Sequence, residues 1–136
     1  MLNFKTILNL LLNTRDDTSR FNQSDIQGNR FMALLSYIWL GCLVPIFCAK
    51  NSPYALYHAR QGLFLAILES LALLVLHLLG FIPLLGIVFD IAYYIVLVAA
   101  VALSVIGIIN CLNNRAKELP FMSMLLKLLN SVLTKN

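Results

Sequence analysis

Charged residues are scarce in this chain of 136 residues: Asp, Glu, Lys and Arg make up 12% of it, whereas hydrophobic residues make up 60%. A soluble globular domain has about 25% charged and about 45–50% apolar residues. The apolar residues form long runs, which one small domain has too little interior to bury. The composition therefore excludes a soluble enzyme and a disordered chain, and it predicts a small multi-pass membrane protein.

Cysteine and histidine are also rare, with three of the first and two of the second. Cys42, Cys48 and Cys111 have no CxxC spacing and lie in or beside apolar runs, which favours small buried hydrophobes over metal or redox groups. A disulfide-stapled secreted miniprotein is excluded as well. Since neither an HExxH nor a GxSxG motif is present, we expect no metal site, no cofactor, no catalytic residue and no enzyme activity.

The net charge of +4 comes from ten Lys and Arg against six Asp and Glu. The basic residues lie almost entirely outside the apolar runs and form no dense basic tract, so no nucleic-acid partner is expected. Attraction to anionic lipid headgroups explains them more simply, at about 1 kcal/mol per cation near the membrane surface. The predicted partner is therefore a lipid bilayer with anionic headgroups.

Three apolar runs predict three transmembrane helices, over residues 31–48, 62–81 and 86–110. Ser52 is a good N-cap and Pro53 a good first helical residue, so a new helix is predicted to begin there, ahead of the second run. The short connector between the last two runs carries no charge, which predicts a helical hairpin.

The segments that flank the spans are more polar. Residues 1–13 are predicted to form an amphipathic helix in the membrane interface, followed by a polar linker over 14–29. The transmembrane domain would cover 30–112, and a basic linker with a second interfacial helix would cover 113–136. The predicted fold is all-α. Three spans place the termini on opposite sides of the membrane, and six of the ten Lys and Arg then lie on the side of the C-terminus. Because basic residues are enriched on the cytoplasmic side, this favours a cytoplasmic C-terminus.

Four stretches carry a family resemblance: NRFMALLSYIWL at 29–40, VPIFCAKNSPYALYHARQG at 44–62, FIPLLG at 81–86 and IGIINCLNNRAKELPFM at 106–122. The most specific element is an aromatic-His-x-x-Gln-Gly pattern, which begins here at Tyr57. Together they resemble a family of small bacterial multi-pass membrane proteins related to the Tic translocon component of the chloroplast inner envelope, a broad group that includes magnetosome membrane proteins. The resemblance implies three or four helices, no known catalysis and a scaffold or translocation-accessory role.

Three polar residues in the first turns of the predicted helix that begins at Pro53, just ahead of the second span, form a candidate interfacial motif. His58 and Gln61 share one helix face, and Arg60 lies to the side of it. Two interpretations stay open. One is a contact to a lipid headgroup or a partner; the other is an anchor that caps loops and reaches to the interface.

Glu69 lies about 10 Å into the second span at 1.5 Å per residue, where an ionised carboxylate is costly. It could relay protons, bind a cation, or stay protonated and hydrogen-bonded inside the bundle. The expected hairpin register places it opposite Val98, which is apolar. Glu69 should therefore turn towards the first span, near Gly41 or Cys42, or towards another subunit.

Small residues at four-residue spacing predict a packing seam between the second and third spans. Gly62, Ala66 and Ser70 form the stripe on the second span, and Ala100 and Ser104 form it on the third. If the hairpin turns near Pro83, the two stripes meet.

The same register places His77 opposite Asp90, close to the connector, with Tyr94 nearby. Because an isolated ionisable group there would carry a desolvation cost, the two side chains are predicted to face each other within direct or single-water reach. A pin that fixes the hairpin register is favoured over a proton-transfer site.

The function predicted from these observations is that of a non-enzymatic scaffold or accessory subunit in the cell membrane of a bacterium. A homo-oligomer or a larger membrane complex would then be its partner. The alternative is an oligomeric transporter, channel or translocation subunit that uses Glu69 in the membrane.

Overall fold

The computed structural model describes residues 3–122 and residue 125. This part of the chain is all-α, with no β-strand among the described residues. The helices in chain order are α1 (Phe4–Leu12), the 3₁₀ turn η1 (Thr18–Arg20), α2 (Gln23–Leu35), the 3₁₀ turn η2 (Trp39–Cys42), α3 (Leu43–Cys48), α4 (Pro53–Leu79) and α5 (Gly86–Leu112).

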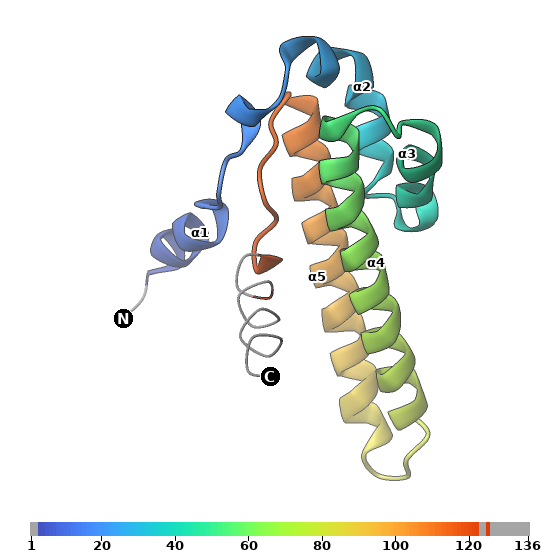
Figure 1. The fold of residues 1–136 in the computed structure, drawn as a ribbon. Helices are drawn as coiled ribbons and strands as arrows, with labels where there is room; N and C mark the ends of the chain where they lie inside the picture. The colour runs from blue at the N-terminus through green and yellow to red at the C-terminus, as the bar shows by residue number, and fades with distance from the viewer. Residues whose placement is uncertain (1–2, 123–124, 126–136) are drawn as a thin grey trace, which may run out of the picture.

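Two long antiparallel helices, α4 and α5, form a hairpin that runs the length of the molecule (Figure 1). Both are long and apolar enough to cross a membrane, with mean hydropathies of 2.3 and 2.7. The start of α4 confirms the predicted signals: Pro53 is in its first turn, and the Ser52 hydroxyl accepts a hydrogen bond from the Ala55 amide at 3.0 Å.

The connector between α4 and α5 turns tightly. A Cβ on Gly86 would lie 2.2 Å from the Gly80 carbonyl oxygen, so the two ends of the connector approach each other closely. Leu84, in the middle of the connector, has a φ of 67° and a side chain that is 98% exposed. α4 ends two residues before the predicted end of the second span, and α5 begins at the predicted residue and ends two residues later than predicted.

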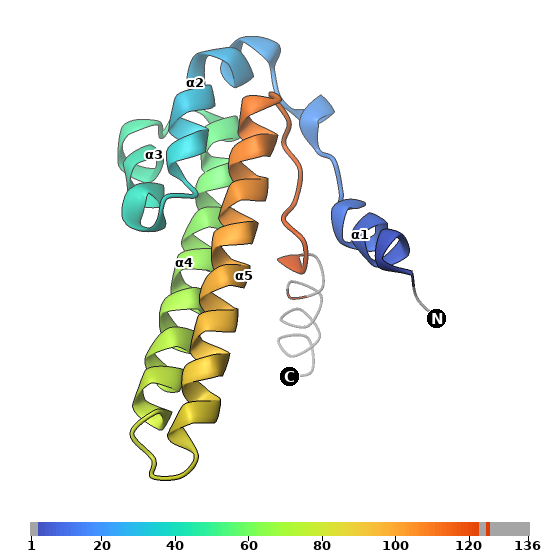
Figure 2. The same ribbon diagram turned by 180° about the vertical axis from the view of Figure 1, so that it is seen from behind.

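The apolar run 31–48 is not a third span, so the three-span prediction is wrong on this point. α2 descends along the hairpin, the chain reverses at η2, and the six-residue α3 returns towards the start of α4 (Figure 2). The structure therefore has two long apolar helices, and the apolar helix over Trp39–Cys48 is a shorter one.

The reversal has a local cause. Trp39 has a φ of 40°, outside the helical region, and the next turn closes tightly with the Gly41 amide 2.6 Å from the Ile38 carbonyl. A Cβ on Gly41 would lie 2.5 Å from the Leu35 carbonyl oxygen, so this position needs glycine. Pro45 then sits in α3, where its missing amide fits a helix that has just begun.

The α2–α3 unit packs on the upper part of the hairpin. A Cβ on Gly62 of α4 would lie 1.8 Å from the Ser36 carbonyl oxygen, and one on Gly107 of α5 would lie 2.4 Å from the Tyr37 ring. These close approaches place the core at this end. It comprises the buried side chains of Ile26, Ala33, Tyr37, Tyr54, Leu65, Cys111, Ala116, Leu119 and Met122.

The segment before α2 lies against the segment after α5. The Asp17 amide donates to the Ala116 carbonyl at 2.8 Å, and the Glu118 amide donates to the Arg15 carbonyl at 3.0 Å. Three spans would have placed these two chain segments on opposite sides of the membrane, whereas the structure brings them together at one end of the hairpin.

Of the two predicted flanking helices, the structure describes the N-terminal one and only the beginning of the C-terminal segment. α1 falls inside the predicted 1–13 helix, and its location in a membrane interface stays a prediction. The described residues from 113 to 121 form no helix. The predicted C-terminal helix lies mainly outside the described residues.

Candidate functional site

His58 lies at the centre of a polar cluster where α2, the start of α4 and the segment after α5 meet. Its Nε2 is 3.1 Å from the Arg115 carbonyl oxygen, and its Nδ1 is 2.8 Å from the Tyr37 hydroxyl. Because a carbonyl can only accept, Nε2 carries the proton and Nδ1 accepts from Tyr37. Burial raises the pKa of the Tyr37 hydroxyl well above its ordinary value, so this donor keeps its proton.

Gln61 and Tyr54 bind the same extended segment from the face of α4 that carries His58. The Gln61 Oε1 accepts from the Leu119 amide at 2.8 Å, and its Nε2 donates to the Lys117 carbonyl at 3.5 Å. The Tyr54 hydroxyl donates to the Arg115 carbonyl at 3.4 Å. Three side chains on one helix face thus bind backbone groups of this segment that its pairing with residues 15–17 leaves free.

Asp25 of α2 caps α4 from outside the local sequence. Its Oδ2 accepts from the Tyr54 backbone amide at 3.0 Å, and its Oδ1 accepts from the Ser52 hydroxyl at 2.5 Å and from the Asn29 side-chain Nδ2 at 2.9 Å. A carboxylate at a helix N-terminus satisfies an otherwise unpaired N–H and complements the helix dipole.

Asp17 is a buried carboxylate, with 5% of its surface exposed, whereas Asp25 is only partly buried. It accepts from Arg15 Nε at 2.9 Å, and its other oxygen lies 3.5 Å from the Tyr57 hydroxyl that donates to it. Arg20 lies 3.5 Å away as a weaker ion pair. The cluster therefore uses its polar side chains to hold three chain segments together. Within the described residues, no group of three or more His, Cys, Asp and Glu could hold a metal ion.

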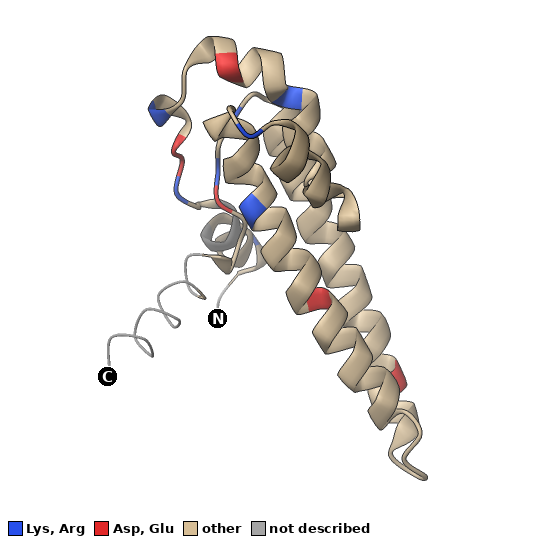
Figure 3. Ribbon diagram, turned by 45° about the vertical axis from the view of Figure 1, so that its right-hand side comes forward, with Lys and Arg blue, Asp and Glu red and all other residues tan. Residues whose placement is uncertain are grey.

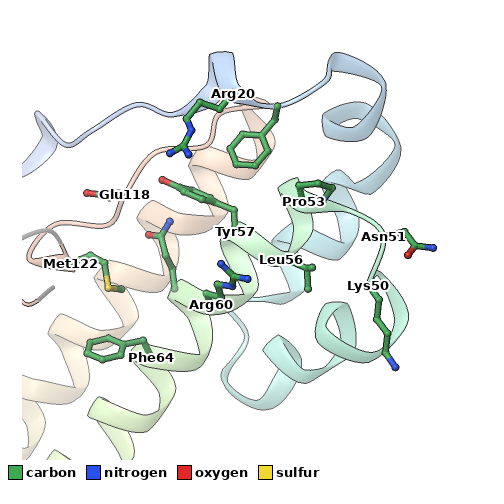
Figure 4. A pocket seen from close by; sticks show the side chains of 12 residues that line it. Arg20, Lys50, Asn51, Pro53, Leu56, Tyr57, Arg60, Phe64, Glu118 and Met122 are labelled. Atoms are coloured by element: carbon green, nitrogen blue, oxygen red, sulfur yellow. The ribbon is translucent and has the colours of Figure 1, made fainter. Parts of the chain in front are cut away.

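Arg60 points away from this cluster into a neighbouring pocket of about 790 Å³ (Figure 4). The predicted motif of His58, Arg60 and Gln61 is thus divided by the structure. His58 and Gln61 are buried and hydrogen-bonded to backbone, whereas Arg60 is exposed.

Glu69 lies on α4 below the polar cluster and is partly buried. It borders a cavity of about 10 Å³, to which Ser36 and Trp39 contribute from the α2–η2 region and Ser104 contributes from α5. Its neighbours around this cavity from the first apolar run are therefore Ser36, Tyr37 and Trp39, and the predicted neighbours Gly41 and Cys42 do not line it. A cavity of this size has room for about one water molecule.

The predicted seam residues do not all lie between α4 and α5. Gly62 packs against Ser36, and the Ser70 hydroxyl accepts from the Trp39 indole at 3.3 Å, so both face the α2–η2 region. Ala66 and Ser104 line the small cavity beside Glu69. Ala100 is buried on α5.

His77 and Asp90 both lie near the connector, and no hydrogen bond joins them in the part of the chain that the structure describes. The His77 ring packs edge-on against Phe81 at 5.4 Å between centroids and lies 6.4 Å from Tyr93, one residue from the expected Tyr94. The Asp90 carboxylate lies against Gly80: its Oδ1 is 2.8 Å from the position that a Cβ on Gly80 would occupy.

Sequence reasoning did not find Asp17, Asp25 and Tyr37, which complete the polar cluster. The sequence has an N-cap signal at Ser52, but nothing local indicates that a carboxylate from another helix would join it. The i, i+4, i+7 spacing of Tyr54, His58 and Gln61 was the available signal, since it puts three polar side chains on one face.

Three similar proteins are magnetosome proteins. The chain is 34% identical over 93 residues to magnetosome protein MmsF of Paramagnetospirillum magneticum, covering 68% of this chain and 79% of that one. It is 34% identical over 92 residues to MamF of Magnetospirillum gryphiswaldense, covering 68% and 77%. To MamF of Paramagnetospirillum magneticum it is 42% identical over 55 residues, which is 40% of this chain and 46% of that one.

No family model and no solved structure matches the chain. The magnetosome part of the predicted resemblance is confirmed, and the relation to the Tic component stays a prediction. With these relatives and two long apolar helices, the chain is a membrane protein. It belongs to the family of the magnetosome proteins MamF and MmsF.

Proposed function

We propose that the protein is a non-enzymatic scaffold or accessory subunit of a larger assembly in a bacterial cell membrane. Its relatives are named as proteins of the magnetosome, which supports a role as one component of a larger structure. Both ring nitrogens of His58 are engaged in internal hydrogen bonds, so this histidine offers no free nitrogen to act as a base.

The observation that carries this proposal is the unpartnered surface of the α4–α5 hairpin. Below the α2–α3 unit, large apolar side chains are exposed on both helices, among them Leu71, Leu78, Ile91 and Val98. Only 17% of the most apolar window of each helix is buried inside the molecule. A surface of this kind is covered by lipid or by helices of other subunits.

The experiment is photo-crosslinking of the full chain in its native membrane. A photoreactive amino acid at Leu78 or Ile91 on the hairpin should give discrete protein adducts, identified by mass spectrometry as a second copy or another subunit. The same amino acid at the exposed Arg30 of α2 is the control. Adducts with lipid alone at both hairpin positions would contradict the proposal.

A second candidate, an oligomeric transporter, is favoured by the position of Glu69 on an apolar helix beside Ser36 and Ser104. Two helices enclose no pathway, so transport would need several copies. Glu69→Gln keeps the shape of the side chain and removes its charge. If this variant assembles and functions as the wild type does, the transport candidate loses its support.

A further inference from the structure

The pocket beside the polar cluster is formed by four separate parts of the chain (Figure 4). Its volume of about 790 Å³ is within the range of small-molecule sites. Its walls come from η1, from the turn before α4, from the first three turns of α4 and from the segment after α5. The lining residues are Arg20, Phe21, Lys50, Asn51, Pro53, Leu56, Tyr57, Arg60, Gln61, Phe64, Glu118 and Met122.

The charge of this pocket is positive. Arg20, Lys50 and Arg60 line it together with a single carboxylate, Glu118. Among the described residues, the side chains of Lys50 and Arg60 make no hydrogen bond or ion pair, and the Arg20 side chain has only the 3.5 Å contact to Asp17. The two guanidinium groups come from opposite walls and are directed towards the space around Tyr57, with Lys50 at the far edge (Figure 4).

The wall that continues down α4 is apolar. Leu56 and Phe64 of α4 and Met122 of the C-terminal segment line it, and Phe64 lies one helical turn below Arg60. From Gly62 to Leu79 the helix is mainly apolar over about 27 Å at 1.5 Å per residue, close to the hydrocarbon thickness of a bilayer. If this stretch spans the hydrocarbon, Arg60 would lie at the depth of lipid phosphates and Phe64 at the depth where acyl chains begin.

We propose that this pocket binds the headgroup of an anionic phospholipid. The phosphate would lie between Arg20 and Arg60, because a guanidinium group matches phosphate oxygens with two parallel N–H donors. The first carbons of the acyl chains would lie against Phe64 and Met122. A free phosphate ion would use the same cations and would leave the apolar wall uncovered, so the lipid is the occupant that fits both halves of the pocket.

The test compares lipid retention by full-length protein purified in mild detergent. Phosphatidylglycerol, phosphatidylcholine or inorganic phosphate is added, and the bound species are counted by native mass spectrometry. Wild-type protein should retain phosphatidylglycerol at least several-fold better than phosphatidylcholine, and excess inorganic phosphate should not displace it. The double variant R20Q/R60Q should lose this preference.

The matched control is K5Q/R30Q, which also removes two positive charges, but from residues outside the pocket. This variant should retain phosphatidylglycerol as the wild type does. Equal losses in the two double variants would overturn the proposal, since the preference would then come from net charge. Displacement by inorganic phosphate would identify a free-anion site instead. Should R20Q/R60Q fail to fold, the wild-type comparison decides alone: equal retention of the two lipids would overturn the proposal.

Discussion

Gly62 of α4 lies directly against the carbonyl oxygen of Ser36 at the end of α2, so that a Cβ at this position would be 1.8 Å from that oxygen. A contact this close to backbone cannot be relieved by a side-chain rotation. It fixes α2 on the hairpin and makes the glycine of the aromatic-His-x-x-Gln-Gly pattern a packing requirement of the fold.

The first prediction follows from this contact. Gly62→Ala should destabilise the protein by about 1–3 kcal/mol, because overpacking exceeds the gain of up to about 1 kcal/mol in helix propensity. Gly28→Ala on α2 is the control, since nothing lies within 4 Å of a Cβ there, and it should stabilise slightly. Thermal unfolding in detergent, followed by circular dichroism, measures both. Equal stability of the two variants would contradict the packing argument.

The second prediction concerns the hydrogen bond between Tyr37 and His58. Tyr37→Phe leaves the buried Nδ1 of His58 without a donor, so it should cost about 1–3 kcal/mol of unfolding free energy. Tyr94→Phe removes a hydroxyl from a side chain that is 64% exposed and should have an effect within about 0.5 kcal/mol. A neutral outcome at Tyr37 would show that the His58 ring nitrogen finds another donor.

The third prediction concerns topology. If α4 and α5 cross the bilayer and the α2–α3 unit does not, Ser19 and Cys48 lie on one side and Leu84 on the other. Single-cysteine variants that keep Cys48, or carry Ser19→Cys or Leu84→Cys, can be labelled with a membrane-impermeant maleimide in sealed vesicles. All three positions are exposed, so access reports the side of the membrane. Labelling of position 19 and Cys48 from opposite sides would restore the three-span arrangement.

The fourth prediction concerns the stability at low pH of the pairing between the segments before α2 and after α5. Hydrogen bonds from the hydroxyl and the amide of Thr18 lower the pKa of Asp16 below its ordinary 3.8. Its ionised form therefore stabilises the pairing of Arg15–Thr18 with Ala116–Glu118 fully above pH 3.8, and this contribution is lost as the pH falls through the lowered pKa. Hydrogen exchange of the Asp17 and Glu118 amides should accelerate there relative to neighbouring amides, after correction for intrinsic rates. Asp16→Asn should remove that step.

The hairpin was predictable because each of its determinants is local. Long apolar runs define α4 and α5, Ser52 and Pro53 mark the start of α4, and the uncharged connector is too short for any arrangement other than a turn. Hydropathy is a sum along the chain, so it finds helices of this length well.

The first apolar run was mispredicted because composition does not distinguish a straight span from a reversal. The reversal depends on the φ of Trp39 and on the close approach of Gly41 to Leu35, neither of which hydropathy records. The polar cluster was missed for a related reason. Asp25 and Tyr54 are 29 positions apart, and they meet only once α2 has docked on α4.

The uncharged connector also has a consequence for how the chain is inserted during synthesis. In the two-span arrangement the only residues carried fully across the bilayer are those around Gly80–Gly86, and none of them is charged. Every Lys and Arg from Arg15 to Lys117 stays at the opposite end of the hairpin, as the blue segments of Figure 3 show. If α4 and α5 cross the bilayer, the positive-inside rule would keep that end in the cytoplasm. The hairpin can therefore enter the bilayer as one unit, with no hydrophilic domain to translocate and its orientation set by basic residues that never leave the side on which they were made.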